Sequence, residues 1–413
     1  MKILLVHQNM PGQYREMLDW LVAQGGHELV FLTQRRNFPD RDGVEKVVYA
    51  PHRVPARDAY ALSKVWEEAV GAGYGAAQAA QSLKDRGFVP DIILGHTGWG
   101  ELLFMKQVYP DVPILGFFEY FYLDKGGPVG FDPEDPANDA TPFLIHARNA
   151  VPFANLHVAD RGIVPTEWQR DCFPEMFHPK MWVCHDGIRT DKLRPDPDVW
   201  LSLGRVGRVT REDEIFTYVA RNMERTRGFH LFMRALPLIQ KARPNARVLI
   251  IGGNDTSYGK ESTMKGGFRA EMEAEVGHLI DWDRTHFLGQ VPYESFQKVI
   301  QIGRCHIYLT MPFVLSWSLL ESMSMEATIV ASDVAPVREA ITHGETGLLT
   351  DFFDPPALAE KVIGVLSDPE GHAHLGRAAR EHVVRTYDFL QVCLPRHIEY
   401  INALVPADRR IRM

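Results

Sequence analysis

The sequence has few cysteines and lacks any long apolar run. Its 413 residues include only four cysteines, which lie far apart and form no Cys-x-x-Cys pair. This spacing argues against both a disulfide framework and a zinc knuckle. No stretch approaches the roughly 20 apolar residues that a membrane-spanning helix needs, and the apolar run at the N-terminus is too short for a signal peptide. We therefore expect a cytoplasmic protein.

An excess of basic residues is also missing. The chain has 45 Lys and Arg residues against 53 Asp and Glu residues, and its formal net charge is -8. Nucleic-acid binding depends on clustered cations, which a balanced acidic chain lacks, so we expect no nucleic acid as a partner. A local basic pocket for a small phosphorylated ligand is compatible with this charge.

Several ligand-binding motifs are absent. No Gly-x-Gly-x-x-Gly follows the first apolar run, and the chain has neither a Gly-x-Ser-x-Gly nucleophile elbow nor a His, Cys and Asp cluster with metal-ligand spacing. Residues 252–261 look like a phosphate loop, but Asn254 stands where the first Gly belongs and Glu261 replaces the Ser or Thr that would bind magnesium. We therefore expect no cofactor and no metal site.

Short apolar runs alternate with longer amphipathic segments in both halves of the chain. Continuous Val, Ile and Leu runs are typical of strands buried on both faces of a parallel sheet. The predicted strands are 3–6, 29–32, 92–94, 114–118, 156–158, 162–164, 181–184, 216–220, 247–251, 285–288, 306–309 and 328–331. The predicted helices between them are 14–23, 63–85, 101–108, 228–242, 270–277, 316–325 and 356–366. This alternation predicts an α/β fold of two doubly wound domains in series.

The domain boundary is expected in a polar stretch between residues 187 and 212, where neither a helical nor a strand period fits. Residues 203–214 are expected to be irregular. We place an N-terminal Rossmann-like domain at residues 1–190 and a C-terminal one at residues 191–389. A C-terminal helix at about residues 390–413 is expected to pack back on the N-terminal domain.

Candidate binding residues follow the predicted strands of the N-terminal half. Ligands of open α/β sheets bind beyond the carboxyl ends of the strands. Gly12 follows the first strand and lets a phosphate or sugar approach the backbone without a Cβ in the way, although plain turn chemistry is its commoner role. His96 and Trp99 lie in a glycine-rich loop after another strand. A structural histidine packed against Trp99 is the alternative for His96.

The C-terminal half has a basic pair and a carboxylate at comparable positions. Arg221 ends a predicted strand and Arg227 precedes a helix, and guanidinium groups suit the oxygens of a diphosphate. The alternative is a solvated charge cluster, which fits Arg225. Ser316–Trp317 open a later helix, whose N-terminus would add amides. On that helix Glu321 can accept hydrogen bonds from a ribose, or equally form a salt bridge.

The C-terminal half resembles the retaining glycosyltransferases of family 4, which have the two-Rossmann GT-B fold. The matching segments, in the order of the family, are 218–221 with 227–229, 250–253, 286–292, 320–323, 329–333, 337–340 and 344–349. The N-terminal half matches more loosely, through Gly12, 91–96, 165–166 and 185–188.

The resemblance implies roles for individual residues. Arg221 and Arg227 fall where the family binds the donor diphosphate, with Arg227 in place of a Lys. Glu321 matches the second carboxylate of the Glu-x7-Glu motif, which binds the ribose. Gln290 and Val291 match the loop that meets the nucleotide base.

The implied activity is metal-independent transfer of a hexosyl unit from a nucleotide sugar, a UDP-sugar being favoured, with retention of configuration. The acceptor would be a glycan, a lipid-linked molecule or a small molecule in polysaccharide or glycoconjugate synthesis, so contact with the inner face of the membrane is compatible with this reading. The N-terminal domain would bind the acceptor and the C-terminal domain the donor. Closure of the domains would exclude water. The sequence makes no prediction of the oligomeric state.

Two positions depart from the family. Phe313 stands where the family has the first Glu of its motif, and a phenyl ring cannot accept hydrogen bonds from the hydroxyls of the donor sugar. Glu119 stands where many members have a His near the transferred sugar, and a carboxylate there could bind hydroxyls, act as a base or only tie down its own loop. A nucleotide-sugar 2-epimerase, which shares the architecture, and a non-catalytic nucleotide-sugar-binding protein are the alternatives.

Overall fold

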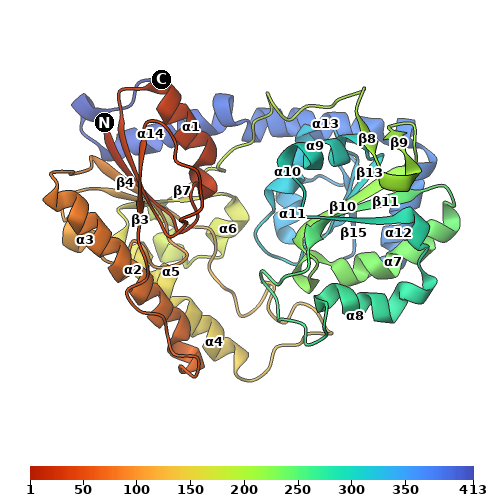
Figure 1. The fold of residues 1–413 in the computed structure, drawn as a ribbon, viewed down its shortest axis with the longest axis horizontal. Coiled ribbons are helices and arrows are strands. Elements are labelled where there is room, and N and C mark those ends of the chain that lie inside the picture. The colour runs from red at the N-terminus through yellow and green to blue at the C-terminus, as the bar shows by residue number, and fades with distance from the viewer. The chain divides into compact units, whose positions relative to one another are not determined.

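The computed structural model describes all 413 residues and divides them into two compact units (Figure 1). The first unit consists of Met1–Gly187 together with Phe389–Met413, and the second consists of Ile188–Asp388. The chain therefore passes from one unit to the other twice. The boundary expected after residue 190 lies three residues into the second unit, and the C-terminal segment belongs to the first unit.

The first unit is built on a sheet of seven parallel strands in the order β3-β2-β1-β4-β5-β6-β7. The strand order reverses between β1 and β4, which is the point where open α/β sheets bind ligands. The strands are β1 (Lys2–Val6), β2 (Glu28–Thr33), β3 (Val44–Val48), β4 (Ile92–His96), β5 (Ile114–Phe117), β6 (Arg161–Val164) and β7 (Met181–Val183).

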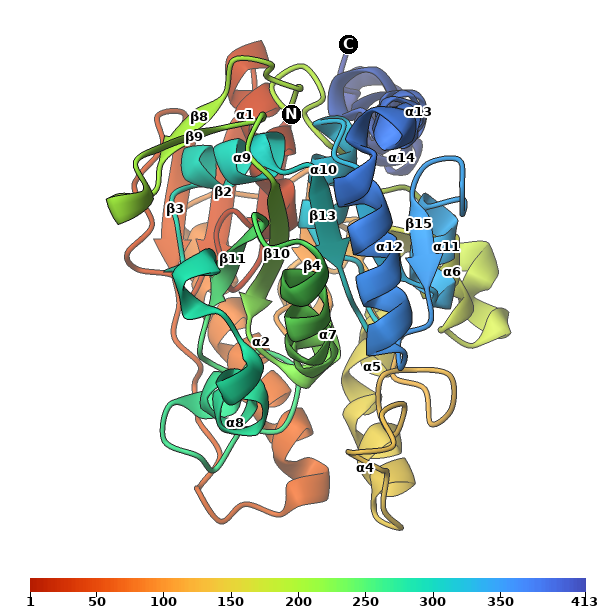
Figure 2. The ribbon, with the colours of Figure 1, turned by 90° about the vertical axis from the view of Figure 1, so that its right-hand side faces the viewer.

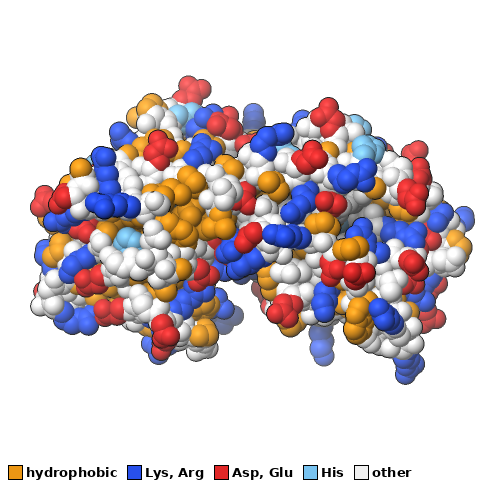
Figure 3. All heavy atoms as spheres, turned by 90° about the horizontal axis from the view of Figure 1, so that it is seen from above, with side chains coloured by type: hydrophobic (Ala, Val, Ile, Leu, Met, Phe, Trp, Pro, Cys, Tyr) orange, Lys and Arg blue, Asp and Glu red, His pale blue; other side chains and the backbone are white.

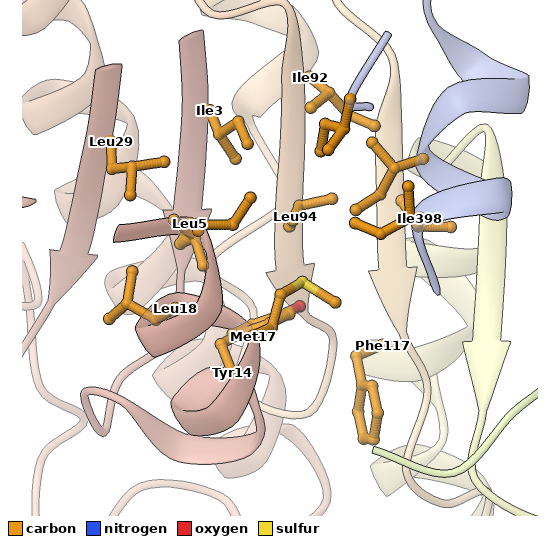
Figure 4. Packing of buried hydrophobic residues seen from close by; sticks show 14 of the residues in the cluster. Ile3, Leu5, Tyr14, Met17, Leu18, Leu29, Ile92, Leu94, Phe117 and Ile398 are labelled. Carbon is orange, nitrogen blue, oxygen red and sulfur yellow. The ribbon is translucent and has the colours of Figure 1, made fainter. Parts of the chain in front are cut away.

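Helices cover both faces of this sheet because successive residues of a strand point to opposite sides. Ile3 and Leu5 of β1 pack with α1 and the C-terminal α14, as Figure 4 shows, while Leu4 and Val6 pack on the other side with α2. Ile398 of α14 belongs to the same buried cluster as Ile3. The helices are α1 (Arg15–Gln24), α2 (Ala61–Asp85), α3 (Met105–Val108), α4 (Thr141–Arg148), α5 (Ala150–Val158), α6 (Glu167–Asp171) and α14 (Leu394–Leu404).

The second unit repeats this plan with six parallel strands in the order β12-β11-β10-β13-β14-β15. Here the order reverses between β10 and β13. The strands are β10 (Ile215–Asn222), β11 (Arg247–Gly253), β12 (Thr285–Gly289), β13 (Cys305–Tyr308), β14 (Ile329–Ser332) and β15 (Leu348–Thr350), preceded by an antiparallel pair of β8 (Trp200–Ser202) and β9 (Arg208–Thr210).

The helices of the second unit also lie on both faces of its sheet, and α7 and α12 pack against each other on one of them (Figure 2). They are α7 (Phe229–Ala242), α8 (Gly267–Val276), α9 (Tyr293–Ile302), α10 (Trp317–Ser324), α11 (Ala335–Ala340), α12 (Pro355–Ser367) and α13 (Pro369–Tyr387). The predicted α/β class with two doubly wound domains is thereby confirmed.

Some predicted elements were wrong. Residues 156–158 end helix α5 instead of forming a strand, because a stretch of only three residues, two of them apolar, suits a buried helix as well as a strand. Residues 203–214 are not wholly irregular, since they contain β9 of the antiparallel pair. The helix predicted at 101–108 is regular only over Met105–Val108, and the edge strands β3 and β15 were missed.

The surface mixes charges of both signs. On the face drawn in Figure 3, acidic and basic side chains are interspersed over each unit and form no continuous basic surface. None of the helices combines the length and the apolar character that crossing a bilayer requires.

Candidate active site

The predicted residues of the first unit lie at the carboxyl end of its sheet. β1, β4 and β5 lie near the middle of the sheet, and His7, His96 and Glu119 stand at or just beyond their ends. Gln13, from the turn that leads into α1, joins them through hydrogen bonds. Gly12, His96 and Glu119 were predicted from the sequence, whereas His7 and Gln13 were not, although His7 directly follows the first strand.

His7 is a neutral hydrogen-bond donor. Burial, with a smaller contribution from repulsion by His96, lowers the pKa of His7 to about 3. Its Nδ1 accepts the Asn9 N–H at 2.9 Å, so the ring hydrogen is on Nε2, which lies 2.7 Å from Gln13 Oε1. Gln13 Nε2 donates in turn to Glu119 Oε1 at 3.3 Å. This line of hydrogen bonds orients the Glu119 carboxylate.

His96 faces the other oxygen of the same carboxylate. Its ring is buried and stacks on Trp99 with 4.2 Å between the ring centroids, and its Nδ1 accepts the Gly98 N–H at 3.0 Å. His96 Nε2 lies 3.4 Å from Glu119 Oε2 and has no hydrogen-bond partner. The Glu119 side chain is 34% exposed. A ligand hydroxyl at this carboxylate would satisfy the buried nitrogen, whose desolvation is otherwise uncompensated.

Gly12 is required by the packing of its own loop. Its φ is +54°, and a Cβ at this position would lie 2.4 Å from His7 Nε2. The glycine therefore lets the loop pass over the His7 ring. The structure supplies this packing reason for the glycine, and a role in ligand binding stays a prediction.

A buried carboxyl group, Glu101, lies in the segment that follows β4. Glu101 is fully buried, and burial raises the pKa of its carboxyl. Its Oε1 accepts the Tyr49 hydroxyl at 2.8 Å, while its Oε2 has no partner. Glu101 was not predicted, because nothing in a single sequence distinguishes it from a surface glutamate at the start of a helix.

In the second unit, Arg227 is a buried cation without an acidic partner. Its side chain forms no ion pair, although only 6% of the residue is exposed. Nη1 donates to Thr310 Oγ1 at 2.9 Å, and Nη1 and Nη2 both donate to Val314 O at 3.2 Å. The rings of Tyr258 and Phe313 lie 5.4 and 5.9 Å from its Cζ. A buried charge without a counter-ion costs several kcal/mol, which an anionic ligand would offset.

Arg221 stands at the other end of the same loop. It is the penultimate residue of β10, its side chain is exposed, and it makes neither a hydrogen bond nor an ion pair. Hydrogen bonds thus fix the guanidinium of Arg227 before α7, whereas the guanidinium of Arg221 at the end of β10 makes none. Arg225, which we predicted to be a solvated charge, is half-buried, and its Cζ lies 5.0 Å from the ring of Phe268.

The N-terminus of α10, which is the positive end of the helix dipole, also lies in this region. Ser316 caps the helix, and its side chain accepts the Ser318 N–H at 3.4 Å. The Val314 carbonyl that binds Arg227 lies only two residues before this cap, and Trp317 is 38% exposed at the first turn. Both the guanidinium and the helix dipole favour an anion here.

The residues predicted to bind the nucleoside are linked through Tyr293. Glu321 is 6% exposed, and its Oε1 accepts the Tyr293 hydroxyl at 2.6 Å. Tyr293 begins α9 directly after the Gln290–Val291 segment. A Cβ on Gly253 would lie 2.9 Å from Gln290 Nε2, so the ends of β11 and β12 meet closely at this point. Tyr293 was missed because a surface tyrosine after a proline carries no recognisable signal.

No three His, Cys, Asp or Glu side chains are grouped so that they could hold a metal ion.

Two family models match the chain in consecutive segments. A model of the "Glycosyl transferase family 4 group" matches residues 25–193, and a model of "Glycosyl transferases group 1" matches residues 205–382. The first segment contains His96 and Glu119. The second contains Arg221, Arg227 and Glu321.

Curated relatives are similar at low identity. The phosphatidyl-myo-inositol mannosyltransferase of Mycolicibacterium smegmatis is 27% identical over 183 residues, which cover 43% of this chain and 42% of the relative. The D-inositol 3-phosphate glycosyltransferase of Thermobispora bispora is 24% identical over 55% of this chain and 53% of its own length. The chain thus matches less than two thirds of either relative. The glycogen synthase of Mycobacterium tuberculosis is 24% identical over 98% of this chain and 95% of its own length.

Solved structures share the fold over the whole chain. Sucrose-phosphate synthase from Thermosynechococcus elongatus superposes with a TM-score of 0.73 at 18% identity, covering 98% of this chain and 99% of that one. HepE from Anabaena, solved in complex with UDP and glucose, gives a TM-score of 0.68 at 14% identity, covering 98% of this chain and all of that one. At these identities the likeness concerns the fold alone, and it agrees with the predicted GT-B class.

Proposed function

The chain belongs to the glycosyltransferases of family 4, and from this premise we propose that it transfers a hexosyl unit from a nucleotide sugar to an acceptor hydroxyl, without a metal ion and with retention of configuration. The observation that carries the proposal is the buried, unpaired charge of Arg227 beside the N-terminus of α10. A protein tolerates such a charge where a ligand supplies the counter-ion, and a diphosphate is the anion that the family donors provide.

In the proposed reaction, negative charge develops beside the guanidinium groups of Arg227 and Arg221. Breaking the anomeric C–O bond leaves negative charge on the departing phosphate oxygen. Arg227, held by Thr310 and Val314, would stabilise this charge together with Arg221 and the amides that begin α10. With retention, the departing phosphate itself takes the proton of the acceptor hydroxyl on the same face of the sugar.

Glu321, Gln290 and Val291 are proposed to hold the nucleoside. The Glu321 carboxylate, whose Oε1 accepts the Tyr293 hydroxyl in this structure, would also accept hydrogen bonds from the ribose hydroxyls. A uridine nucleotide is favoured, because the structurally similar HepE was solved with UDP and with UDP-glucose. The proposed acceptor is a glycan, a lipid-linked molecule or a small molecule, and a lipid-linked acceptor would bring the protein to a membrane surface.

In the first unit, Glu119 is proposed to bind a hydroxyl of the sugar or of the acceptor. Its carboxylate is 34% exposed, while Gln13 orients one oxygen and His96 Nε2 faces the other. Neutral His7 fixes the orientation of Gln13, because its Nε2 hydrogen bonds to Gln13 Oε1 while its Nδ1 accepts the Asn9 N–H. These side chains would therefore position a hydroxyl rather than carry positive charge.

The experiment that tests the proposal is a binding and product screen. Calorimetric titration with UDP, GDP and ADP identifies the base, and incubation of the matching nucleotide sugars with an acceptor panel identifies the transfer. We expect one nucleoside diphosphate to bind in preference and a glycoside of retained configuration to form. An epimerised nucleotide sugar without acceptor would indicate the 2-epimerase instead. Binding with neither transfer nor hydrolysis would indicate a non-catalytic protein.

A further inference from the structure

The side chain at position 313 does not open onto the donor region. Phe313 is only 6% exposed, and its ring packs against Tyr258 with 5.0 Å between the centroids and 59° between the planes. The residue that stands where the family supplies a carboxylate to the donor sugar is thus covered by another aromatic side chain. The surface next to Arg227 is formed by Tyr258 instead.

Tyr258 is held in place by its backbone. The loop between β11 and α8 passes over Glu224, whose Oε2 accepts the N–H groups of Ser257 and Tyr258 at 3.2 and 3.0 Å. Asn222 Nδ2 also donates to Ser257 Oγ at 2.7 Å. One hydrogen bond of Tyr258 and two of the preceding Ser257 therefore anchor the backbone here, although it lies outside any helix or strand.

The ring of Tyr258 borders the position that we assign to the diphosphate. Its centroid lies 5.4 Å from the Cζ of Arg227, within the range of a cation–π contact. The Tyr258 side chain is 45% exposed, and its hydroxyl has no hydrogen-bond partner. It presents both an apolar ring face and a free hydroxyl, side by side with the buried cation.

Glu224 is an acidic side chain near this point, but it is covered, and its Oε1 is buried without a hydrogen-bond partner. It is 3% exposed, and one of its oxygens accepts two backbone amides. Its position explains the anchoring of the loop and leaves it covered, so it does not replace the missing carboxylate at the surface.

We propose that Tyr258 binds the sugar of the nucleotide-sugar donor, its ring stacking on a C–H face of the hexose and its hydroxyl meeting a sugar hydroxyl, in place of the carboxylate that Phe313 has displaced. This inference rests on the proposed function, since it takes the diphosphate to lie at Arg227. Recognition by an aromatic surface selects the shape of a sugar face, whereas a carboxylate selects the direction of individual hydroxyls.

The test compares affinity for the nucleotide sugar with affinity for the free nucleoside diphosphate. Wild type, Tyr258→Ala and Tyr258→Phe are titrated with UDP, GDP and ADP and with UDP-glucose, GDP-mannose and ADP-glucose. Tyr258→Ala should weaken binding of the accepted nucleotide sugar about ten-fold and leave nucleoside diphosphate binding within about two-fold of wild type. Tyr258→Phe, which keeps the ring, should retain most of the affinity. The matched control is Tyr60→Ala, an exposed tyrosine of the first unit whose side chain makes no contact of this kind.

The outcomes separate the two proposals. An equal loss of nucleotide-sugar and nucleoside diphosphate affinity in Tyr258→Ala would mean that the ring only supports Arg227, and unchanged affinity for both would mean that it meets no sugar. Either result would overturn the inference while leaving the proposed function in place. Failure of the wild type to bind any of the nucleotides would instead contradict the proposed function itself.

Discussion

Arg221 offers the sharpest test of the diphosphate site, because the folded protein does not use its side chain. Its guanidinium is exposed and makes no hydrogen bond or ion pair. Substitutions at such positions change the free energy of unfolding by no more than about 0.5 kcal/mol. Arg221→Ala should therefore leave the thermal unfolding of the protein unchanged, so that any loss of binding or activity reflects a missing ligand contact.

The expected size of the loss follows from charge-assisted hydrogen bonding. A hydrogen bond to a charged group contributes about 1.5–3 kcal/mol, which corresponds to an increase of roughly 10- to 150-fold in the Kd for the nucleoside diphosphate. Removal of a donor to developing transition-state charge costs about 2.7–4 kcal/mol, so turnover should fall about 100- to 1000-fold. Because the group is exposed, the effect on binding should shrink as salt is added.

The assay is calorimetric titration with the preferred nucleoside diphosphate, together with initial rates and thermal unfolding of the same preparations. Arg205→Ala is the matched control, since Arg205 is an exposed arginine of the same unit without a side-chain partner. It should resemble wild type in all three measurements. Wild-type Kd and turnover in Arg221→Ala would refute the assignment of Arg221 to the diphosphate.

Four further predictions concern the rest of the site and its stability. Glu119→Gln, which keeps the size of the side chain, should lower kcat substantially while nucleoside diphosphate affinity stays nearly unchanged; unchanged kcat would make Glu119 a structural residue. Gly12→Ala should lower the free energy of unfolding by at least about 1–2 kcal/mol in chemical denaturation, because its φ is +54° and its Cβ would meet His7, and wild-type stability would contradict this geometry. Activity should survive EDTA, because guanidinium groups carry the proposed charge neutralisation; complete loss that Mg²⁺ or Mn²⁺ restores would overturn this. Burial lowers the pKa of His7 and of His306 to about 3. Between about pH 6.5 and pH 3 the folded state therefore binds fewer protons than the unfolded state. The free energy of unfolding should fall as the pH decreases, by about 1.4 kcal/mol per pH unit for each histidine. Between pH 4 and 6, His306→Gln should halve the slope that these two histidines contribute to the plot of unfolding free energy against pH. An unchanged slope would show that His306 does not titrate on unfolding.

The local pattern of the sequence determined the fold class. Apolar runs such as Ile3–Val6 and Arg247–Ile251 contain no polar alternation, and only strands covered on both faces tolerate this, so two parallel sheets followed directly. The same reasoning placed Arg221, His96 and Glu119 near strand ends. The end of a strand can be predicted from local composition. Because parallel strands run in the same direction, their carboxyl ends then lie at one edge of the sheet.

The tertiary structure decided what the local pattern left ambiguous. Residues 156–158 became part of a helix, since so short a stretch, apolar only at positions 156 and 158, fits either element and its tertiary neighbours decide between them. The edge strands β3 and β15 are partly polar or short, because an edge strand buries less surface and needs a weaker pattern.

The partners of the candidate residues were likewise set only by the fold. His7, Gln13 and Glu119 are joined by hydrogen bonds across as many as 106 residues, and Tyr293 reaches Glu321 across 28. Such contacts depend on which strands become neighbours, and no local pattern encodes that. The sequence by itself determined that Arg227 is basic and precedes a helix in the turn after a strand. Only packing made it a buried cation without a counter-ion, because burial and the absence of a carboxylate are properties of the assembled sheet and its loops.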